Sequence, residues 1–153
     1  MNPIRAGMEA PDFTLQSDSG TSVTLSGLRG RPVVLYFYPR DDTPGCTVEA
    51  CEFRDAWGDV EKAGAVVIGV SPDDVPSHGR FRTKFQLPFP LLADPDHRVA
   101  ELYGVWGEKS MYGRTFFGIL RTTFVIDPGG RVRQVFERVK PKGHAARVLE
   151  ALR

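Results

Sequence analysis

The chain has 153 residues, of which 41% are hydrophobic and 25% charged, and its formal net charge is +1. This composition excludes a disordered chain, a coiled coil and a fibre, and we expect residues 1–153 to form a single domain. The balance of 20 basic against 19 acidic residues gives no reason to expect a nucleic-acid partner.

The first half of the chain predicts a small hairpin, followed by two buried strands with a helix between them. Residues 13–25 contain two short apolar segments around the turn sequence DSG at residues 18–20, which is typical of a β-hairpin. Residues 32–39 and 65–70 are near-continuous apolar, β-branched and aromatic runs, as expected of strands covered on both faces. A helical pattern over residues 46–62 connects them.

The second half predicts shorter helices and a second hairpin. The expected elements are a helix over residues 75–85, a short strand at 91–92, one or two helical turns at 98–103, a hairpin of 122–126 with 131–136, and an amphipathic helix over 142–152. The sequence DPGG between the hairpin strands is a turn signal and not a phosphate-binding loop. Buried strands that alternate with helices, then a hairpin and a closing helix, predict an α/β fold with a mixed sheet flanked by helices.

The sequence contains no targeting signal, and only two cysteines. Its first residues, MNPIRAG, lack the apolar core of a signal peptide, and no apolar run approaches the roughly 20 residues of a membrane span. Cys46 and Cys51 are too few and too close together for the disulfide framework of a small secreted domain. We therefore expect a cytoplasmic protein with no membrane partner, whose cysteine pair is catalytic, redox-active or incidental.

The residues before the first predicted helix favour a reactive cysteine. Thr43 suits the N-cap and Pro44 suits the first helical position, where its missing N–H costs nothing. This assignment places Cys46 in the first helical turn. The unpaired N–H groups and the helix dipole there favour an anion, which lowers the pKa of a thiol and produces the nucleophilic thiolate.

Two nearby carboxylates act in the opposite direction. Asp41 and Asp42 precede the helix, where their negative charges disfavour a thiolate. A cation must offset them if the cysteine is to be reactive. Arg40 is close in sequence but can point away, so we expect the cation to come from a distant segment.

Helical geometry separates the two cysteines. The first belongs to an apolar stripe that we expect to be buried, made of Cys46, Ala50, Phe53, Trp57 and Val60. Cys51 lies roughly 140° further around the axis, with its Cα roughly 8.6 Å from that of Cys46 in an intact helix. Disulfides rarely tolerate more than about 7 Å between Cα atoms, so a bridge between these cysteines requires the helix to unwind.

The residues around the first cysteine resemble the peroxiredoxin family. The pattern Pro39-x-x-x-Thr43-x-x-Cys46 matches the active-site motif of that family, and residues 36–55 are similar to its Q-type, or bacterioferritin-comigratory-protein, subfamily. Three segments of the second half resemble the same subfamily, namely residues 106–109, 112–113 and 118–127. The similarity covers nearly the whole chain.

The resemblance implies a thiol peroxidase of thioredoxin-like fold with an added N-terminal β-hairpin, without cofactor or metal and often monomeric. In the family, the cysteine matching Cys46 attacks the O–O bond of a hydroperoxide and becomes a sulfenic acid. The residue matching Thr43 binds the peroxide, the one matching Arg121 stabilises the thiolate and the leaving oxygen, and the one matching Pro39 shields the cysteine. Cys51 matches the resolving cysteine, whose disulfide is reduced by thioredoxin or a similar dithiol protein.

Other interpretations of these residues stay open. Arg114 is the alternative to Arg121 as the distant cation, and Cys51 also suits plain helix packing. A thiol–disulfide oxidoreductase is a second functional hypothesis, although such enzymes usually carry Cys-x-x-Cys, which this chain lacks. A redox-inactive thioredoxin-fold module that binds a partner is the third. Consumption of peroxide with loss of both thiols separates the first hypothesis from the third.

The remaining titratable residues predict no further site. His78, His97 and His144 are scattered, so we interpret all three as surface or capping residues, and with two cysteines they do not form a zinc-binding pattern. Six basic residues near the C-terminus are interpreted as a solvated face: Arg131, Arg133, Arg138, Lys140, Lys142 and Arg147.

Overall fold

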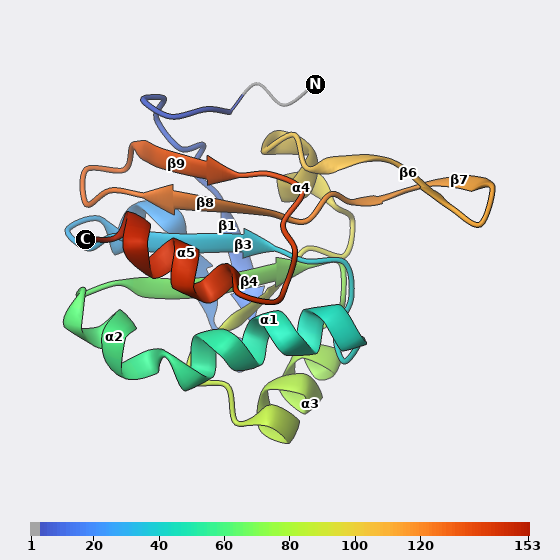
Figure 1. Ribbon diagram of the computed structural model, residues 1–153, viewed down its shortest axis with the longest axis horizontal. Coiled ribbons are helices and arrows are strands. Elements are labelled where there is room, and N and C mark those ends of the chain that lie inside the picture. Colours follow the sequence, from blue (N-terminus) through green and yellow to red (C-terminus); the bar gives the residue numbers. More distant parts are fainter. Residues whose placement is uncertain (1–3) are drawn as a thin grey trace.

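The computed structural model describes residues 4–153, and its strands and helices follow one another in the order that Figure 1 shows. The strands are β1 (Thr14–Ser17), β2 (Ser22–Thr24), β3 (Val33–Phe37), β4 (Val66–Ser71), β5 (Leu91–Ala93), β6 (Trp106–Met111), β7 (Arg114–Ile119), β8 (Thr122–Ile126) and β9 (Val132–Phe136). The helices are α1 (Pro44–Asp55), α2 (Trp57–Lys62), α3 (Val75–Phe85), α4 (Arg98–Leu102) and α5 (His144–Ala151), with a short 3-10 helix η1 (Leu25–Leu28).

Seven of these strands form one mixed sheet in the order β2-β1-β5-β4-β3-β8-β9. The central strands β3, β4 and β5 run parallel, whereas β8, β9, β1 and β2 pair antiparallel. All five residues of β3 are buried, as the continuous apolar run predicts for a strand covered on both faces. The predicted α/β fold with a mixed sheet is confirmed.

Each face of the sheet has its own apolar core. Helices α1, α2, α3 and α5 cover one face, and Figure 1 shows α5 in front of the strands, with α1 and α2 below β4 in this view. The other face is covered by the N-terminal segment, η1 and α4. Neighbouring residues of β3 alternate between the two cores, with Val34 and Tyr36 in the first and Leu35 and Phe37 in the second. Helices therefore flank both faces, as predicted.

Both predicted hairpins are present. Strand β1 pairs with β2 in the register Leu15↔Val23 and also with β5 in the register Gln16↔Ala93, so the N-terminal hairpin extends one edge of the main sheet. Strands β8 and β9 form the second hairpin, at the opposite edge.

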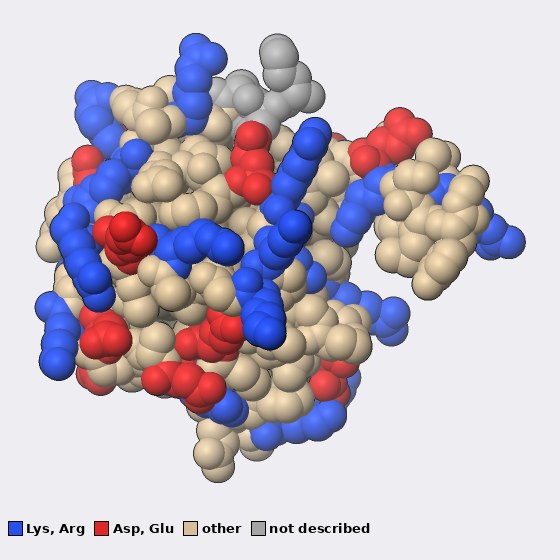
Figure 2. All heavy atoms as spheres, viewed as in Figure 1, with Lys and Arg blue, Asp and Glu red and all other residues tan. Residues whose placement is uncertain are grey.

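Two features differ from the predicted elements. The helix expected over residues 46–62 is two helices, α1 and α2, which are separated at Ala56. Strands β6 and β7 form a second, two-stranded sheet that the sequence did not predict. This arm projects from the body of the protein (Figures 1 and 2), and Tyr112 at its tip is 97% exposed.

Charged side chains of both signs are interspersed over the face drawn in Figure 2. The six basic residues near the C-terminus are all exposed, which confirms their interpretation as a solvated face. Over the part of the chain that the structure describes, no helix has the length and apolar character needed to cross a membrane.

Candidate active site

The first turn of α1 begins where the sequence predicts. Thr43 is the N-cap residue with extended backbone, and Pro44 occupies the first turn, so Cys46 is the third residue of the helix. The Thr43 side chain makes no capping bond, contrary to the usual function of a threonine at this position. Its hydroxyl instead donates to the carbonyl of Arg40 at 2.9 Å, which closes the loop before the helix. Pro39 lies in this loop and is half-buried.

Arg121 reaches Cys46 from a distant part of the chain. It immediately precedes β8, which pairs with β3, so its backbone lies beside the strand that leads to α1. Arg121 Nη2 donates a hydrogen bond to Cys46 Sγ at 3.3 Å. Gly45 permits this approach, because a Cβ at that position would lie 3.3 Å from Arg121 Nη2. Arg114 and Arg40, the other candidate cations, are exposed, and within residues 4–153 neither donates a hydrogen bond to the thiol.

The charges around Arg121 hold it as a cation. Burial lowers the pKa of Arg121, but the negative charges of Cys46 and Glu49 and the hydrogen bonds to both raise it, and the net shift is upward. The guanidinium lies within hydrogen-bond distance of the sulfur, a geometry that suits an anionic partner. The N-terminus of α1 acts in the same direction through its dipole.

Glu49 is a member of the site that sequence reasoning missed. Its carboxylate is completely buried and accepts a 2.7 Å hydrogen bond from Arg121 Nη1 through Oε1. Oε2 has no hydrogen-bond partner among the residues that the structure describes. Burial raises the pKa of Glu49 to about 7, although Arg121 opposes the shift and Glu52 adds to it. Its position three residues after Cys46 was an available signal, because residues at i and i+3 share a helix face.

His144 lies behind Glu49, at the start of α5. Its Nε2 is 2.8 Å from Thr123 Oγ1 and 3.9 Å from Glu49 Oε2. Burial, together with the positive charges of Arg147 and Arg121, lowers the pKa of His144 to about 4, so the imidazole is neutral at pH 7. The interpretation of this histidine as a surface or capping residue is wrong, because Thr123 supplies a buried hydrogen-bond partner.

His78 is also buried, so the same interpretation is wrong for it. Its ring nitrogens contact the Asp41 carboxylate and the Leu92 carbonyl at 2.7 and 2.9 Å. His97 alone behaves as predicted: it is only partly buried and is the N-cap residue of α4, and its ring stacks on Trp106 with a centroid distance of 3.8 Å.

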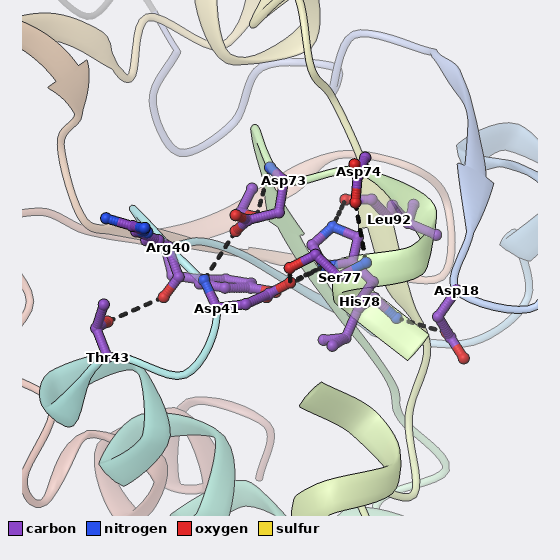
Figure 3. A network of polar contacts seen from close by, with 12 residues as sticks. Asp18, Arg40, Asp41, Thr43, Asp73, Asp74, Ser77, His78 and Leu92 are labelled. Carbon is purple, nitrogen blue, oxygen red and sulfur yellow. Dashed lines mark hydrogen bonds and ion pairs between the residues drawn. The ribbon is translucent and has the colours of Figure 1, made fainter. Parts of the chain in front are cut away.

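The two carboxylates before α1 have partners other than the thiol. The side chain of Asp41 turns toward α3, where Figure 3 shows it beside Ser77 and His78. Asp42 forms a 2.8 Å ion pair with Lys84, which also belongs to α3. The opposition to a thiolate that the sequence predicts is therefore reduced, because each negative charge is compensated locally.

Lys109 is a further cation near the site. It belongs to β6, is half-buried, and donates from Nζ to the carbonyl of Ile119 at 2.9 Å. Burial lowers the pKa of Lys109, Arg121 lowers it further, and the charge of Cys46 raises it. These interactions place the base of the projecting arm within the electrostatic environment of the thiol.

Cys51 lies on the same intact helix as Cys46, and both are free thiols. Cys51 is partly exposed, and burial raises the pKa of its thiol, with Arg54 lowering it and Asp55 raising it. A cysteine at a helix N-terminus that is hydrogen-bonded by an arginine, with a second thiol five residues later, is the arrangement of a thiol-based redox enzyme.

Known proteins of similar sequence and structure define this class further. A profile described as the AhpC/TSA family matches residues 6–135. The peroxiredoxin Bcp of Bacillus subtilis is 47% identical over 150 residues, which cover 98% of this chain and 96% of that protein. The structure of Xylella fastidiosa PrxQ superposes with a TM-score of 0.94 at 36% identity, covering 99% of this chain and 97% of the other.

A third likeness is to Xanthomonas campestris bacterioferritin comigratory protein, described for its alkyl peroxide reduction activity. The two share 42% identity and a TM-score of 0.90, and the match covers 96% of each chain. The chain belongs to the AhpC/TSA family and is a peroxiredoxin of the Bcp, or Q-type, group. The thioredoxin-like fold that the resemblance implies is thereby confirmed, and the protein is a peroxidase.

Proposed function

We propose that this peroxidase is thiol-dependent and that its Cys46 thiolate attacks hydrogen peroxide and organic hydroperoxides. The observation that carries the proposal is the 3.3 Å hydrogen bond from Arg121 Nη2 to Cys46 Sγ in the first turn of α1. A cation and a helix N-terminus together stabilise the thiolate, which is the nucleophilic form. The alkyl peroxide reduction described for the Xanthomonas campestris relative supports the organic substrates.

The first step transfers one oxygen from the peroxide to sulfur. The S–O bond forms as the O–O bond breaks, and the electron pair moves to the second oxygen, which takes up a proton and leaves as water or an alcohol. Cys46 becomes a sulfenic acid. Arg121, with its other nitrogen held by Glu49, is placed to stabilise the charge that develops on the leaving oxygen.

Thr43 and Pro39 complete the proposed substrate site. The Thr43 hydroxyl donates its only proton to the Arg40 carbonyl, so its lone pairs stay available to accept an O–H group of the peroxide. Backbone N–H groups at the start of α1 supply donors to the peroxide oxygens. We assign Pro39 the role of shielding the thiol from bulk water.

The second step forms a disulfide between Cys46 and Cys51. The Cys51 sulfur attacks the sulfenic sulfur, a water molecule leaves, and thioredoxin or a similar dithiol protein then reduces the bond. With α1 intact the two cysteines are too far apart, so the helix has to unwind over about residues 43–52. Unwinding also removes the burial that raises the pKa of Cys51, which makes this thiol more reactive once the helix is open.

We further propose that residues 1–153 act as one catalytic domain, as a monomer, and in a reducing compartment such as the cytoplasm. Both cysteines are free thiols, which is the state that begins the cycle. The proposal requires only a hydroperoxide and a dithiol reductant as partners.

Turnover of the Cys46→Ser variant tests this function. Peroxide consumption would be followed with thioredoxin, thioredoxin reductase and NADPH, with the wild-type protein assayed beside it. We expect complete loss of turnover with unchanged circular dichroism, because serine has no accessible anion at neutral pH. Substantial remaining turnover would refute Cys46 as the nucleophile. Wild-type turnover with a small dithiol but not with thioredoxin would exclude thioredoxin as the reductant and leave the peroxidase proposal intact.

A further inference from the structure

A buried carboxylate anchors the loop between β3 and α1. Asp41 accepts hydrogen bonds from Tyr38 Oη at 2.5 Å and from Ser77 Oγ at 2.8 Å. It makes a third contact, of 2.7 Å, with His78 Nδ1 (Figure 3). Ser77 and His78 belong to α3, so the loop is fastened to a helix that does not carry the cysteines. We call these four residues the Asp41 clamp.

The geometry requires a proton between His78 and Asp41. His78 Nε2 is 2.9 Å from the carbonyl oxygen of Leu92, which only accepts hydrogen bonds, so Nε2 carries a hydrogen. Nδ1 then faces Asp41 Oδ2 at 2.7 Å, a distance at which two lone pairs would repel. One proton therefore lies in this contact, whichever partner formally owns it. The side chains of His78 and Asp41 are only 0% and 4% exposed, so this bond is not replaced by water.

The same contact distinguishes a hydrogen-bonded clamp from a metal site. Ligand-type atoms of Asp41, Asp73 and His78 all lie within 4.8 Å of one another. An ion between His78 and Asp41 would prevent their direct 2.7 Å contact. Asp73 also has its own donors, the Ser71 hydroxyl at 2.6 Å and the Asp41 N–H at 2.8 Å.

The Asp41 clamp holds the backbone conformation of the loop that carries Thr43. The next residue, Asp42, has a φ of 56°, a left-handed conformation that costs a residue other than glycine about 1 kcal/mol and persists only where its surroundings hold it. Thr43 follows directly, and its hydroxyl is oriented by the Arg40 carbonyl of the same loop. Asp41 lies between Arg40 and Asp42, so a shift of its side chain is transmitted to the Thr43 hydroxyl.

We propose that His78 is a positioning residue for the peroxidase reaction: through Asp41 it holds residues 40–43 so that the Thr43 hydroxyl receives the peroxide beside Cys46. This inference rests on the proposed function of Thr43 and Cys46. His78 does not touch the peroxide itself, and it acts only through the loop.

Two substitutions of His78 separate positioning from packing. In His78→Asn the amide nitrogen occupies about the place of Nδ1 and can still donate to Asp41. In His78→Gln the amide nitrogen occupies about the place of Nε2, so the bond to Leu92 is kept and the donor to Asp41 is lost. Both variants remove the ring and bury an amide, so a purely structural role would affect them alike. The measurement is the second-order rate constant for sulfenic acid formation with hydrogen peroxide, below the unfolding temperature of each variant.

We expect the rate constant of His78→Gln to be about tenfold or more below that of His78→Asn, because small misplacements of a binding group are costly. In a Thr43→Val background the difference should disappear, since the hydroxyl being positioned is absent. Equal rate constants for the two His78 variants would overturn the proposal. Failure of the wild-type protein to consume peroxide would instead overturn the proposed function.

A measurement on the unaltered protein covers the case in which a variant does not fold. The ¹⁵N resonances of the His78 ring report the proton in the His78–Asp41 contact directly. A protonated or strongly hydrogen-bonded Nδ1 is expected. A bare Nδ1 with a free lone pair would show that the clamp does not exist and would overturn the proposal.

Discussion

Replacing Glu49 by glutamine should change how the stability of the protein depends on pH. Burial raises the pKa of Glu49 from 4.5 to about 7, against the lowering effect of Arg121. Between these two values the folded protein holds a proton at Glu49 that the unfolded chain has lost. Stability therefore falls as the pH rises through this range, by about 1.4 kcal/mol per pH unit and about 3 kcal/mol in all.

His144 has the opposite effect in the wild-type protein. Burial, Arg147 and Arg121 lower the pKa of His144 from 6.5 to about 4. Between these values the unfolded chain holds a proton that the folded protein lacks, so stability rises with pH, again by about 3 kcal/mol in all. From about pH 4.5 to about pH 6.5 the contributions of Glu49 and His144 to the pH dependence of stability cancel, so neither is visible in the wild-type stability curve.

Glu49→Gln keeps an oxygen that accepts from Arg121 but removes the titration of the carboxylate. The stability of the variant relative to wild type should increase by about 3 kcal/mol between about pH 4.5 and about pH 7.5. The assay is urea unfolding of both reduced proteins across this range, followed by circular dichroism. Taking the difference at each pH cancels the titrating groups that the two proteins share.

Glu61→Gln on α2 is the matched control, since this carboxylate is exposed. Its stability curve should run parallel to that of wild type at every pH. A Glu49→Gln difference that stays constant within about 1 kcal/mol would refute the reasoning. It would show that Arg121 compensates the buried carboxylate fully.

Three further outcomes follow from the site and its chemistry. Arg121→Ala should reduce the fraction of Cys46 present as thiolate at neutral pH, measured by thiolate absorbance, and slow peroxide reduction by about 100-fold. Arg121→Lys should give intermediate values. An unchanged thiolate fraction and rate in Arg121→Ala would assign the stabilising role to another cation. Cys51→Ser should consume one equivalent of peroxide and then stall or become over-oxidised at Cys46 unless a small thiol is added; mass spectrometry identifies the oxidation product. Continued turnover of this variant with thioredoxin would contradict the resolving role of Cys51. Amide exchange over residues 43–53 should be faster in the disulfide form than in the reduced form; equal protection, with the bond confirmed by mass, would contradict the required unwinding.

The sequence predicts the position of Cys46 well because the signals around it are local. Thr43 and Pro44 define a helix start within a few residues, and the position of Cys46 in the first turn follows from that alone. Strands β3 and β4 are predicted equally well, because their continuous apolar runs are typical of strands covered on both faces. These features need no knowledge of the rest of the fold.

The partners of the thiol are less accessible to sequence reasoning. The sequence shows that a distant cation is needed, but only the family resemblance singles out Arg121 from Arg114. Glu49 was missed because the buried face of the helix was traced through apolar residues, and a carboxylate is buried there only because Arg121 arrives to pair with it.

The buried histidines and the arm of β6 and β7 were also missed, because their environments depend on the folded chain. His78 and His144 are polar residues whose burial depends on Asp41 and Thr123, which lie far away in the chain. Strands β6 and β7 are largely exposed, so their sequences lack the alternation of apolar and polar residues that marks a half-buried strand. Propensity and periodicity do not report contacts that form only in the folded chain.

In the proposed cycle, Cys46 and Cys51 together carry one oxidation by peroxide. The most direct measurement adds one equivalent of hydrogen peroxide to the reduced protein, counts the remaining thiols, and maps the cysteine peptides by mass spectrometry. We predict that the peroxide is consumed, that both thiols are lost, and that a single peptide species contains the Cys46–Cys51 disulfide. Unconsumed peroxide with two free thiols, or a stable product oxidised at Cys46 while Cys51 stays free, would contradict it.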